Sequence, residues 1–370
     1  MKKIVILGYY GFGNTGDEAI LDGIIQLFRD NFSNVEILIL TKEPDQTSKR
    51  LNVNCHYHAF GLTNYLSNPY LRTRALLHVL SSDLLIIGGG GLYHDYWNTL
   101  PFGLIELLLR KLILKPTIIY SVGVGPYNHN ISCYMASLFF KCVNRICVRD
   151  KESYALLASM GLKNVNIGPD PATYLRKATN VDVKSLEIFR KINLGKFFVI
   201  SLRNWYNSEM EYCLADLLNN LIKETNLDVL FIPFYEDDLK AINAISRRLD
   251  IPDNYAILNG TYSPEELISI MSYSSFTIGM RLHSLILSFC AGVPFFGISY
   301  DPKVRSFCKE IYGDQTENYI ELKCICSDLG HNRVGTFINE LDSNTAIIKQ
   351  KIFIFRNLFK DNLKLIKNFL

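Results

Sequence analysis

The sequence is short of net charge, and this excludes several classes of protein. Its 39 lysine and arginine residues are nearly balanced by 36 acidic residues, which leaves a formal charge of +3. So small an excess does not support nucleic-acid binding through bulk electrostatics. No apolar stretch is long enough to span a bilayer, and the apolar run 4–7 is too short for a signal peptide. We therefore expect a cytoplasmic protein with no nucleic-acid partner.

Several chemical signatures are also missing. The chain has no Cys-x-x-Cys pair, no cysteine–histidine spacing typical of zinc sites and no Gly-x-Ser-x-Gly elbow. These absences argue against a metal centre and against a serine hydrolase. The nine cysteines are odd in number and several lie inside apolar runs, so we predict reduced and mostly buried thiols.

A glycine-rich loop, residues 8–18, follows the first apolar run. Its glycines let backbone N–H groups approach a ligand, and the helix that follows adds a partial positive charge, so the loop predicts an anion site. The spacing Gly11-x-Gly13-x-x-Gly16 departs from the dinucleotide fingerprint because Asp17 follows it, and a carboxylate there would repel a pyrophosphate. Asp17 either adds a favourable charge to the first helical turn or positions and activates an acceptor hydroxyl.

Short β-branched or leucine-rich runs alternate with amphipathic segments along the chain, which predicts parallel sheets with helices on both faces. Because 370 residues exceed one hydrophobic core, we expect two Rossmann-like domains, residues 1–180 and 190–340, with a linker in the polar segment 176–191 and with sheets facing a cleft. The predicted strands are 4–7, 35–40, 84–87, 117–121, 146–148 and 165–167, and then 197–202, 229–233, 255–258, 276–278 and 294–298.

One helix start is specified in detail. Ser263 is a capping serine, Pro264 suits the first helical position, and Glu266 stands where it can complete a capping box. We predict a helix from this point.

Residues 345–370 predict an amphipathic C-terminal helix, with apolar residues at 348, 352, 355, 359, 363 and 366 and six basic residues against the single Asp361. We favour a terminal helix that packs back on the body of the protein. The alternative is peripheral contact with anionic lipid.

Glycine and charged residues recur directly after predicted strands. In open α/β sheets, ligands bind beyond the carboxyl ends of the strands. Two domains with such edges facing each other have the plan of a two-domain transferase. The segments concerned are 8–17, 88–91, 123–126, 149–150, 168–171, 203–204 and 279–283.

The segment 279–284 joins a strand to an apolar helix and contains Arg281 and His283, while Lys303 follows the next strand. We interpret it as an anion site, held by Arg281 or by the helix start, with His283 placed for proton transfer. The alternative is that His283 caps its helix and Arg281 pairs with a surface carboxylate.

Two further segments have open alternatives. Arg149 either binds a carboxylate or phosphate or forms an exposed ion pair with Asp150 or Glu152. The run Gly88 to Gly91 brings backbone close to a ligand, and His94 and Asp95 after it either contact carbohydrate or pack a loop.

Together, the segments 8–19, 88–91, 121–126, 148–150 and 279–284 resemble, in order, the polysaccharide pyruvyltransferase family. The resemblance implies a two-domain GT-B-type fold and transfer of the enolpyruvyl carbons of phosphoenolpyruvate to a sugar, with formation of a pyruvate ketal and release of phosphate. It implies no cofactor besides this donor. The basic tail helix and the apolar helix 104–114 would suit a lipid-linked acceptor at the inner face of the membrane, and the alternative is that either helix belongs to the core. By resemblance Asp17, Arg149, His283 and Lys303 match functional positions.

The assignment of residues follows from these arguments. His283 is the candidate acid and Asp17 the candidate base. Phosphoenolpyruvate carries nearly three negative charges, and the groups that would bind it are Arg149, Arg281, Lys303 and His283. The acceptor side is assigned to Asn14, Gly16, Asp17, Gly90, Gly91, His94 and Asp95. The competing hypotheses are a GT-B glycosyltransferase with a nucleotide-sugar diphosphate at the helix start of Arg281 and His283, and a non-catalytic sugar-binding subunit.

Overall fold

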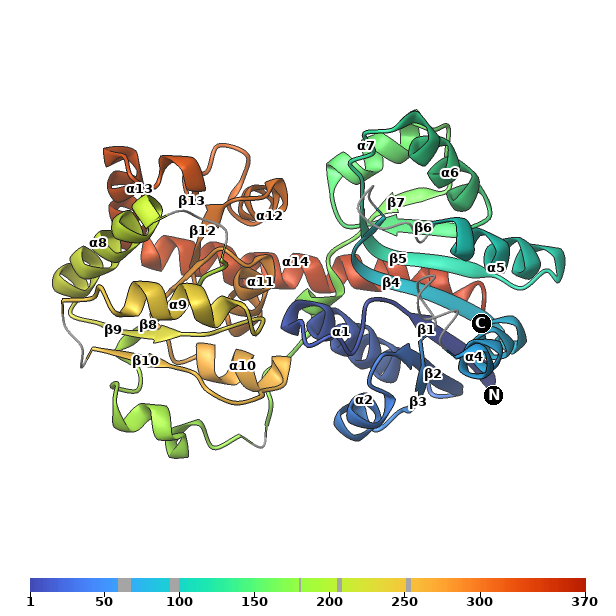
Figure 1. Ribbon diagram of the computed structural model, residues 1–370, viewed down its shortest axis with the longest axis horizontal. Helices are drawn as coiled ribbons and strands as arrows, with labels where there is room; N and C mark the ends of the chain where they lie inside the picture. The colour runs from blue at the N-terminus through green and yellow to red at the C-terminus, as the bar shows by residue number, and fades with distance from the viewer. Residues whose placement is uncertain (59–67, 94–99, 180, 205–207, 251–253) are drawn as a thin grey trace. The chain divides into compact units, whose positions relative to one another are not determined.

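The computed structural model describes residues 1–58, 68–93, 100–179, 181–204, 208–250 and 254–370. Across these residues the chain divides into two α/β units (Figure 1). Unit 1 contains Met1–Tyr174 and Phe355–Leu370, and unit 2 contains Leu175–Ile354. The chain thus passes from unit 1 to unit 2 just before the polar segment 176–191.

Unit 1 is built on a parallel sheet with the order β3-β2-β1-β4-β5-β6-β7 among the described residues. Its central strands are apolar over nearly their whole length because helices cover both faces. The short and more polar β3 is absent from the prediction. The strands are β1 (Lys2–Leu7), β2 (Val35–Thr41), β3 (Asn54–Tyr57), β4 (Leu84–Tyr93), β5 (Thr117–Val124), β6 (Arg145–Val148) and β7 (Val165–Ile167).

Unit 2 repeats this plan with the parallel order β10-β9-β8-β11-β12-β13, counted over the part of the chain that the structure describes. Its core is rich in phenylalanine, including Phe198, Phe231, Phe276 and Phe296. Only β13 lies outside the predicted strands. The strands are β8 (Phe197–Ser201), β9 (Asp228–Phe231), β10 (Tyr255–Ile257), β11 (Thr277–Gly279), β12 (Phe295–Ser299) and β13 (Tyr319–Glu321).

Helices connect the strands in both units. The capping box predicted at Ser263 is confirmed, because its hydroxyl accepts from the Glu266 N–H and the Glu266 carboxylate accepts from the Ser263 N–H. In unit 1 the helices are α1 (Thr15–Asn31), α2 (Pro44–Leu51), α4 (Pro69–Ser81), α5 (Leu100–Leu112), α6 (Asn130–Lys141), α7 (Lys151–Ser159) and the 3-10 helix η1 (Pro171–Tyr174). In unit 2 they are α8 (Ser208–Thr225), α9 (Asp238–Ser246), α10 (Pro264–Met271), α11 (Leu282–Ala291), α12 (Pro302–Tyr312), α13 (Asp328–Asn339) and the 3-10 helices η2 (Val183–Ser185), η3 (Glu187–Arg190) and η4 (Leu322–Cys324).

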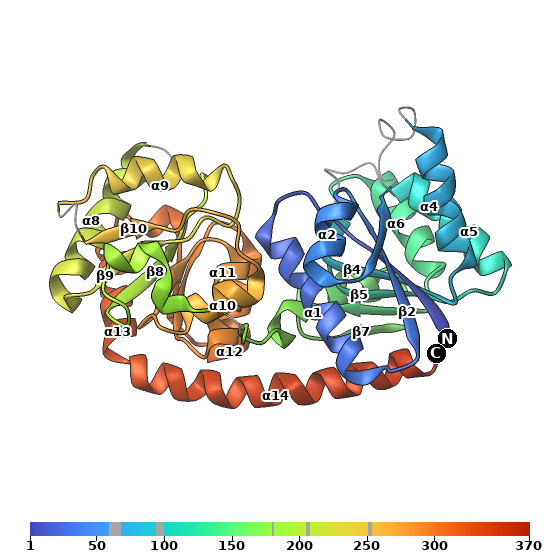
Figure 2. The same cartoon turned by 90° about the horizontal axis from the view of Figure 1, so that it is seen from below.

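The C-terminal helix α14 (Leu341–Lys367) contributes to both units (Figure 2). The apolar residues that the sequence pattern singles out are buried at 348, 355, 359, 363 and 366, and Ile352 is half-buried. In unit 1, Phe359 contacts the Tyr174 ring edge-on, with 5.1 Å between ring centroids. The inward face of α14 therefore packs on the protein and its basic residues lie on the outside.

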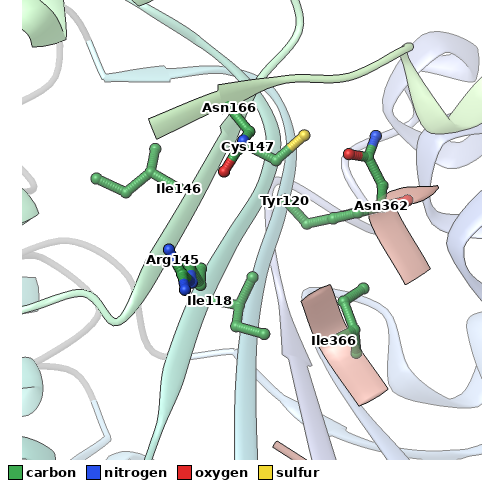
Figure 3. A pocket seen from close by; sticks show the side chains of 8 residues that line it. All are labelled: Ile118, Tyr120, Arg145, Ile146, Cys147, Asn166, Asn362 and Ile366. Atoms are coloured by element: carbon green, nitrogen blue, oxygen red, sulfur yellow. The ribbon is translucent and has the colours of Figure 1, made fainter. Parts of the chain in front are cut away.

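A pocket lies between α14 and the sheet of unit 1 (Figure 3). Tyr120 of β5 and Cys147 of β6 face Asn362 and Ile366 of α14 across it. Its lining is largely apolar, and it lies over the face of β5 and β6 rather than beyond their carboxyl ends. We therefore assign it to imperfect packing of α14 rather than to a ligand.

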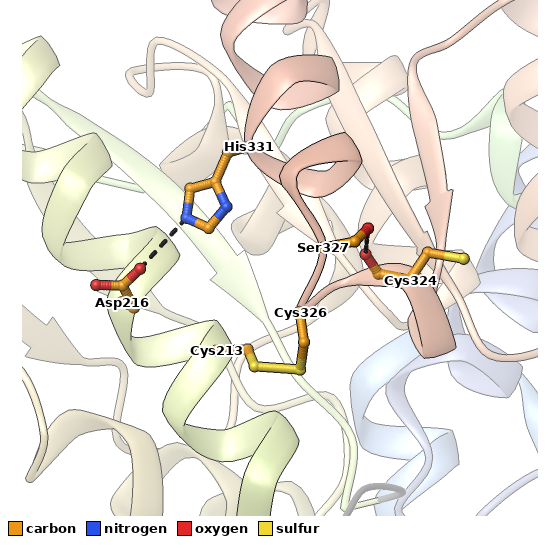
Figure 4. Close-up of a disulfide and its surroundings, with 6 residues drawn as sticks. All are labelled: Cys213, Asp216, Cys324, Cys326, Ser327 and His331. Carbon is orange, nitrogen blue, oxygen red and sulfur yellow. Dashed lines mark hydrogen bonds and ion pairs between the residues drawn. A yellow bond between two sulfur atoms is a disulfide. The ribbon is translucent and has the colours of Figure 1, made fainter.

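The prediction of reduced cysteines is wrong for one pair, while the other seven cysteines are free. Cys213 of α8 and Cys326 before α13 form a disulfide, although 113 residues separate them in sequence (Figure 4). Cys147 and Cys308 are buried, and the other free cysteines are half-buried. Sequence spacing does not reveal such a pair, because only the packing of α8 beside the segment before α13 brings the two sulfur atoms together.

Candidate functional site

The acceptor-side residues lie at the switch point of unit 1, where the strand order reverses between β1 and β4. Asn14 caps α1, since its side-chain oxygen accepts from the Gly16 N–H at 3.1 Å, and its amide nitrogen donates to the Asp17 carboxylate. A Cβ added at Gly90 would lie 2.9 Å from Asp17 Oδ1. The structure thus brings Asn14, Gly16, Asp17 and Gly90 together.

The glycine run is part of β4 rather than a loop after it, which differs from the expectation for residues 88–91. Gly89 and Gly90 have positive φ values of 58° and 82°, so the strand bends where it passes α1. A Cβ at Gly91 would meet nothing within 4 Å, which leaves its backbone open. His94 and Asp95 lie outside the described residues.

An aromatic pair in the glycine loop was not assigned a role from the sequence. The rings of Tyr9 and Phe12 stack with 3.9 Å between centroids and 7° between planes. Lys42 Nζ lies 5.0 Å from the Phe12 centroid, and His58 meets the same ring edge-on. Burial lowers the pKa of His58 to about 3, so this imidazole is neutral. The sequence could have indicated this cluster, because it places aromatic residues inside a glycine loop that is predicted to bind a ligand.

Arg149 lies at the same edge of the unit 1 sheet, next to Gly123, where an added Cβ would be 3.0 Å from the guanidinium. It is flanked by Asp150, with 3.7 Å between Nε and Oδ2, and by Asp170, with 3.5 Å between Nη1 and Oδ2. Arg149 therefore pairs with Asp150, one of the two partners that the sequence suggested, and also with the buried Asp170, to which the sequence analysis assigned no role. These carboxylates compensate the charge of Arg149.

Carboxylates gather around this edge. Burial raises the pKa of the Tyr10 hydroxyl, and the charges of Asp17, Glu18 and Asp170 raise it further. The Tyr10 hydroxyl donates to the Gly88 carbonyl at 2.9 Å. The unit 1 edge therefore offers hydrogen-bond acceptors for hydroxyl groups more than it offers free positive charge.

In unit 2 the switch point lies between β8 and β11, and α11 begins there. Its N-cap residue, Arg281, makes no side-chain cap hydrogen bond. A Cβ at Gly279 would lie 2.2 Å from Ser284 Oγ, so the absence of a side chain lets the helix start approach the strand closely. His283 is half-buried in the first turn. The first-turn N–H groups form a partial positive charge beside this imidazole.

Arg281 forms an ion pair that the sequence did not indicate. Its guanidinium donates to both carboxylate oxygens of the buried Asp238, at 3.2 and 3.1 Å from Nε. Asp238 Oδ2 also accepts from the backbone N–H groups of Phe234 and Tyr235. Neither expected alternative describes this contact, because the carboxylate is not at the surface and the Arg281 charge is compensated. Arg281 fixes the β9–α9 turn to the start of α11.

Two further cations of unit 2, Arg203 and Lys303, follow β8 and β12. Lys303, in the first turn of α12, has its Nζ 3.3 Å from Asp301 Oδ2 and is about one-third exposed. Arg203 donates to the Tyr300 hydroxyl at 2.6 Å and lies 4.9 Å from the centroid of that ring. The sequence predicts only that Arg203 follows a strand. The structure joins it to Tyr300, which follows β12, and we therefore add Arg203 to the candidate anion-binding residues.

Comparison with known proteins gives the family context. A family model described as "Polysaccharide pyruvyl transferase" matches residues 14–302. The chain is 22% identical to the amylovoran biosynthesis protein AmsJ of Erwinia amylovora over an alignment of 359 residues. This alignment covers 84% of this chain and 86% of AmsJ.

Solved structures share the fold at low sequence identity. The UDP-GlcNAc 2-epimerase from Neisseria meningitidis bound to UDP-GlcNAc aligns over 100% of both chains with a TM-score of 0.64 and 13% identity. Anabaena HepE in complex with UDP and glucose also aligns over 100% of both chains, with a TM-score of 0.63 and 12% identity. These likenesses, together with the two parallel sheets, confirm the expected GT-B-like pair of α/β domains.

Proposed function

The chain belongs to the polysaccharide pyruvyl transferase family, and from that premise we propose that it transfers the enolpyruvyl group of phosphoenolpyruvate to a sugar, with ketal formation and release of phosphate. The similarity to AmsJ, an amylovoran biosynthesis protein, supports a place in exopolysaccharide synthesis. The proposal assigns the donor to unit 2 and the acceptor to unit 1. It needs no cofactor besides the donor.

The observation that carries the donor assignment is the start of α11. A helix N-terminus without a side-chain cap favours a phosphate group, and His283 lies in its first turn. Arg203 adds positive charge from the end of β8, and Lys303 follows β12 as a partly exposed cation that shares its charge with Asp301. Arg281 acts as a positioning residue in this proposal, because its own charge is matched by Asp238.

The acceptor assignment rests on the carboxylate and the aromatic rings of the glycine loop. Aromatic faces suit the apolar face of a sugar ring, and the half-buried, stacked Tyr9 and Phe12 are the aromatic residues of the loop proposed for this contact. Asp17, next to the backbone of Gly90, is the proposed base for a sugar hydroxyl. The sequence predicts that Arg149 binds the donor. In this proposal the donor would have to compete with the carboxylates of Asp150 and Asp170 for the Arg149 guanidinium.

The proposed reaction balances as an addition followed by a displacement. His283 gives a proton to the methylene carbon of the donor, which leaves a cationic centre at the carbon that bears the phosphate. One sugar hydroxyl bonds to this centre and passes its proton to Asp17. A second hydroxyl then displaces phosphate and closes the ketal ring, and its proton passes to the His283 imidazole that gave up a proton in the first step.

The test is phosphate release from phosphoenolpyruvate with a panel of free, nucleotide-linked and lipid-linked sugars, with the product mass read for the pyruvate adduct. We expect His283→Ala to lose turnover by about 100-fold or more. His331→Ala is the matched control, because His331 is a histidine of unit 2 that pairs with Asp216 on α8. Unchanged phosphate release by His283→Ala refutes the assignment of the acid.

A glycosyltransferase remains the second candidate because the fold is also that of HepE in complex with UDP and glucose. Its diphosphate would take the same start of α11. Thermal stabilisation by a nucleotide sugar but not by phosphoenolpyruvate favours this alternative. A non-catalytic sugar-binding subunit predicts sugar binding that is indifferent to changes at His283 and Arg149.

A further inference from the structure

Helix α5 carries one stripe of apolar residues outward, although its Leu107 is buried in the core. Ile105, Leu108, Leu109 and Leu112 are all exposed, and Leu112 is 79% exposed. Their spacing of three, four and seven residues places them on one face of the helix. A helix that packs on a globular domain ordinarily turns this face inward, so the exposed stripe of α5 needs an explanation outside the fold.

The orientation of α5 is determined by a buried arginine on the opposite face. Arg110 is fully buried and donates to the Thr117 hydroxyl at 3.0 Å, to the Ser82 hydroxyl at 2.9 Å and to the carbonyls of Val79 and Pro116. With these bonds made, α5 cannot turn its leucines inward without leaving a buried guanidinium unsatisfied.

The end of α5 extends this surface. Lys115 N–H donates to the Arg110 carbonyl and Leu114 N–H to the Lys111 carbonyl, which is the hydrogen-bond pattern of a Schellman motif. Leu114 therefore takes the left-handed position, with φ of 57°, where glycine is preferred, and its side chain is 89% exposed. The left-handed backbone conformation disfavours leucine at this position, and an exposed side chain gains no stability from burial.

We call Ile105, Leu108, Leu109, Leu112, Ile113 and Leu114 the α5 patch; all six side chains are exposed. Helices α4 and α6 pack against α5 and add exposed Leu77 and Tyr134. Exposed apolar side chains therefore occur on α5 and on both helices that contact it, and not at a single leucine.

The exposed charged side chains on α4, α5 and α6 are basic, while Asp83, which follows α4, pairs with Lys115, which follows α5, with 3.2 Å between Oδ1 and Nζ. Helices α4, α5 and α6 contain five arginine and lysine residues, of which Arg110 is buried and Arg72 half-buried, and their one acidic residue, Glu106, is partly buried. Arg74, Lys111 and Lys141 are exposed. The whole chain, in contrast, is almost balanced with 39 basic and 36 acidic residues. An apolar surface with a basic rim complements the headgroups and acyl chains of an anionic bilayer.

We propose that the α5 patch docks unit 1 onto an anionic phospholipid membrane, with the leucines at the acyl boundary and the basic residues at the headgroups. No helix among the described residues is long and apolar enough to cross a bilayer. We therefore propose that α5 lies on the membrane surface and does not span the membrane. A second copy of the chain is a poorer occupant, because a symmetric contact would bring like charges of the two rims together.

The test is co-flotation of the full-length protein with vesicles of phosphatidylcholine alone or of phosphatidylcholine and phosphatidylglycerol in equal parts. We expect binding to the anionic vesicles. Leu109→Ser/Leu112→Ser is expected to weaken it by about tenfold or more, since two large apolar side chains no longer enter the bilayer. Leu114→Gly is expected to weaken binding while it raises the melting temperature, because glycine accepts the left-handed conformation.

Charge variants separate the patch from general attraction. Arg74→Glu/Lys141→Glu is expected to abolish the preference for anionic vesicles. Arg356→Glu/Lys360→Glu on the exposed side of α14 makes the same change of charge elsewhere in unit 1 and is expected to leave binding intact. Absence of binding by the unaltered protein overturns the proposal. So do wild-type binding by the leucine variants, equal losses in the α14 variant, and a dimer in solution that the leucine variants dissociate.

Discussion

The guanidinium of Arg281 and the carboxylate of Asp238 form an ion pair in which the carboxylate is fully buried. The pair ties the start of α11 to the turn before α9, because Asp238 also accepts two backbone hydrogen bonds from that turn. The position of His283 in the proposed donor site therefore depends on a carboxylate 45 residues earlier in the chain.

Removing this carboxylate should be strongly destabilising. Asp238→Ala leaves a mostly buried guanidinium without its counter-charge and is expected to lower the free energy of unfolding by about 3–5 kcal/mol. Urea unfolding measures the loss. The matched control is Asp237→Asn, which removes the charge of an exposed carboxylate that pairs with Lys240 and hydrogen-bonds Asn204, and it should change the unfolding curve little. A small loss in Asp238→Ala, similar to that of the control, contradicts the structural role of the pair.

Neighbouring glycines should differ in their tolerance of alanine. At Gly90 a methyl group would meet Asp17 Oδ1 at 2.9 Å, and φ is 82°. Gly90→Ala is therefore expected to destabilise by about 1–2 kcal/mol and to displace the Asp17 carboxylate. Gly91→Ala meets nothing within 4 Å and should be close to neutral. Thermal melting and phosphate release measured on both variants decide the point, and equal behaviour of the two would speak against the placement of Asp17.

Glu106 should make stability depend on pH. Burial raises the pKa of this carboxyl from 4.5 to about 7, against the smaller opposing effect of Arg72. The folded state then holds the proton more tightly than the unfolded state, so the free energy of unfolding falls as pH rises from about 4.5 through 7. Glu106→Gln is expected to be more stable than the wild type by ~1–3 kcal/mol at pH 8 and to approach it at pH 5. Parallel pH profiles for the two proteins would contradict the raised pKa.

The Cys213–Cys326 disulfide should stabilise unit 2. It closes a loop of 113 residues, and loss of such a cross-link costs about 2–5 kcal/mol. Cys213→Ser is expected to show this loss under oxidising conditions, and reduction of the wild type should give the same curve. Cys324→Ser is the control, since Cys324 lies two residues from Cys326 and is a free thiol. If reduction leaves the wild-type unfolding midpoint unchanged, the bond does not stabilise the protein.

Much of the architecture follows from local pattern. Runs such as 84–87 and 229–233 are apolar enough to be buried on both faces, and their alternation with amphipathic segments is sufficient to predict two parallel sheets. The capping box at Ser263 is specified within four residues, and it forms as predicted. The short polar strands β3 and β13 are not predicted, because their place in the sheet comes from pairing with β2 and β12 rather than from their own composition.

The sequence by itself determined most of the residues that stand at the carboxyl ends of strands, because the apolar runs show where most strands stop, although β4 continues through the glycine run 88–91. Only the tertiary structure decided how their charges are compensated. Asp238 opposite Arg281, Asp170 beside Arg149 and the bond between Cys213 and Cys326 join residues from 21 to 113 positions apart. Such pairings depend on how helices pack across a sheet, which no local spacing along the chain records. The outward face of α5 has the same origin, since the buried contacts of Arg110 determine which way that helix turns.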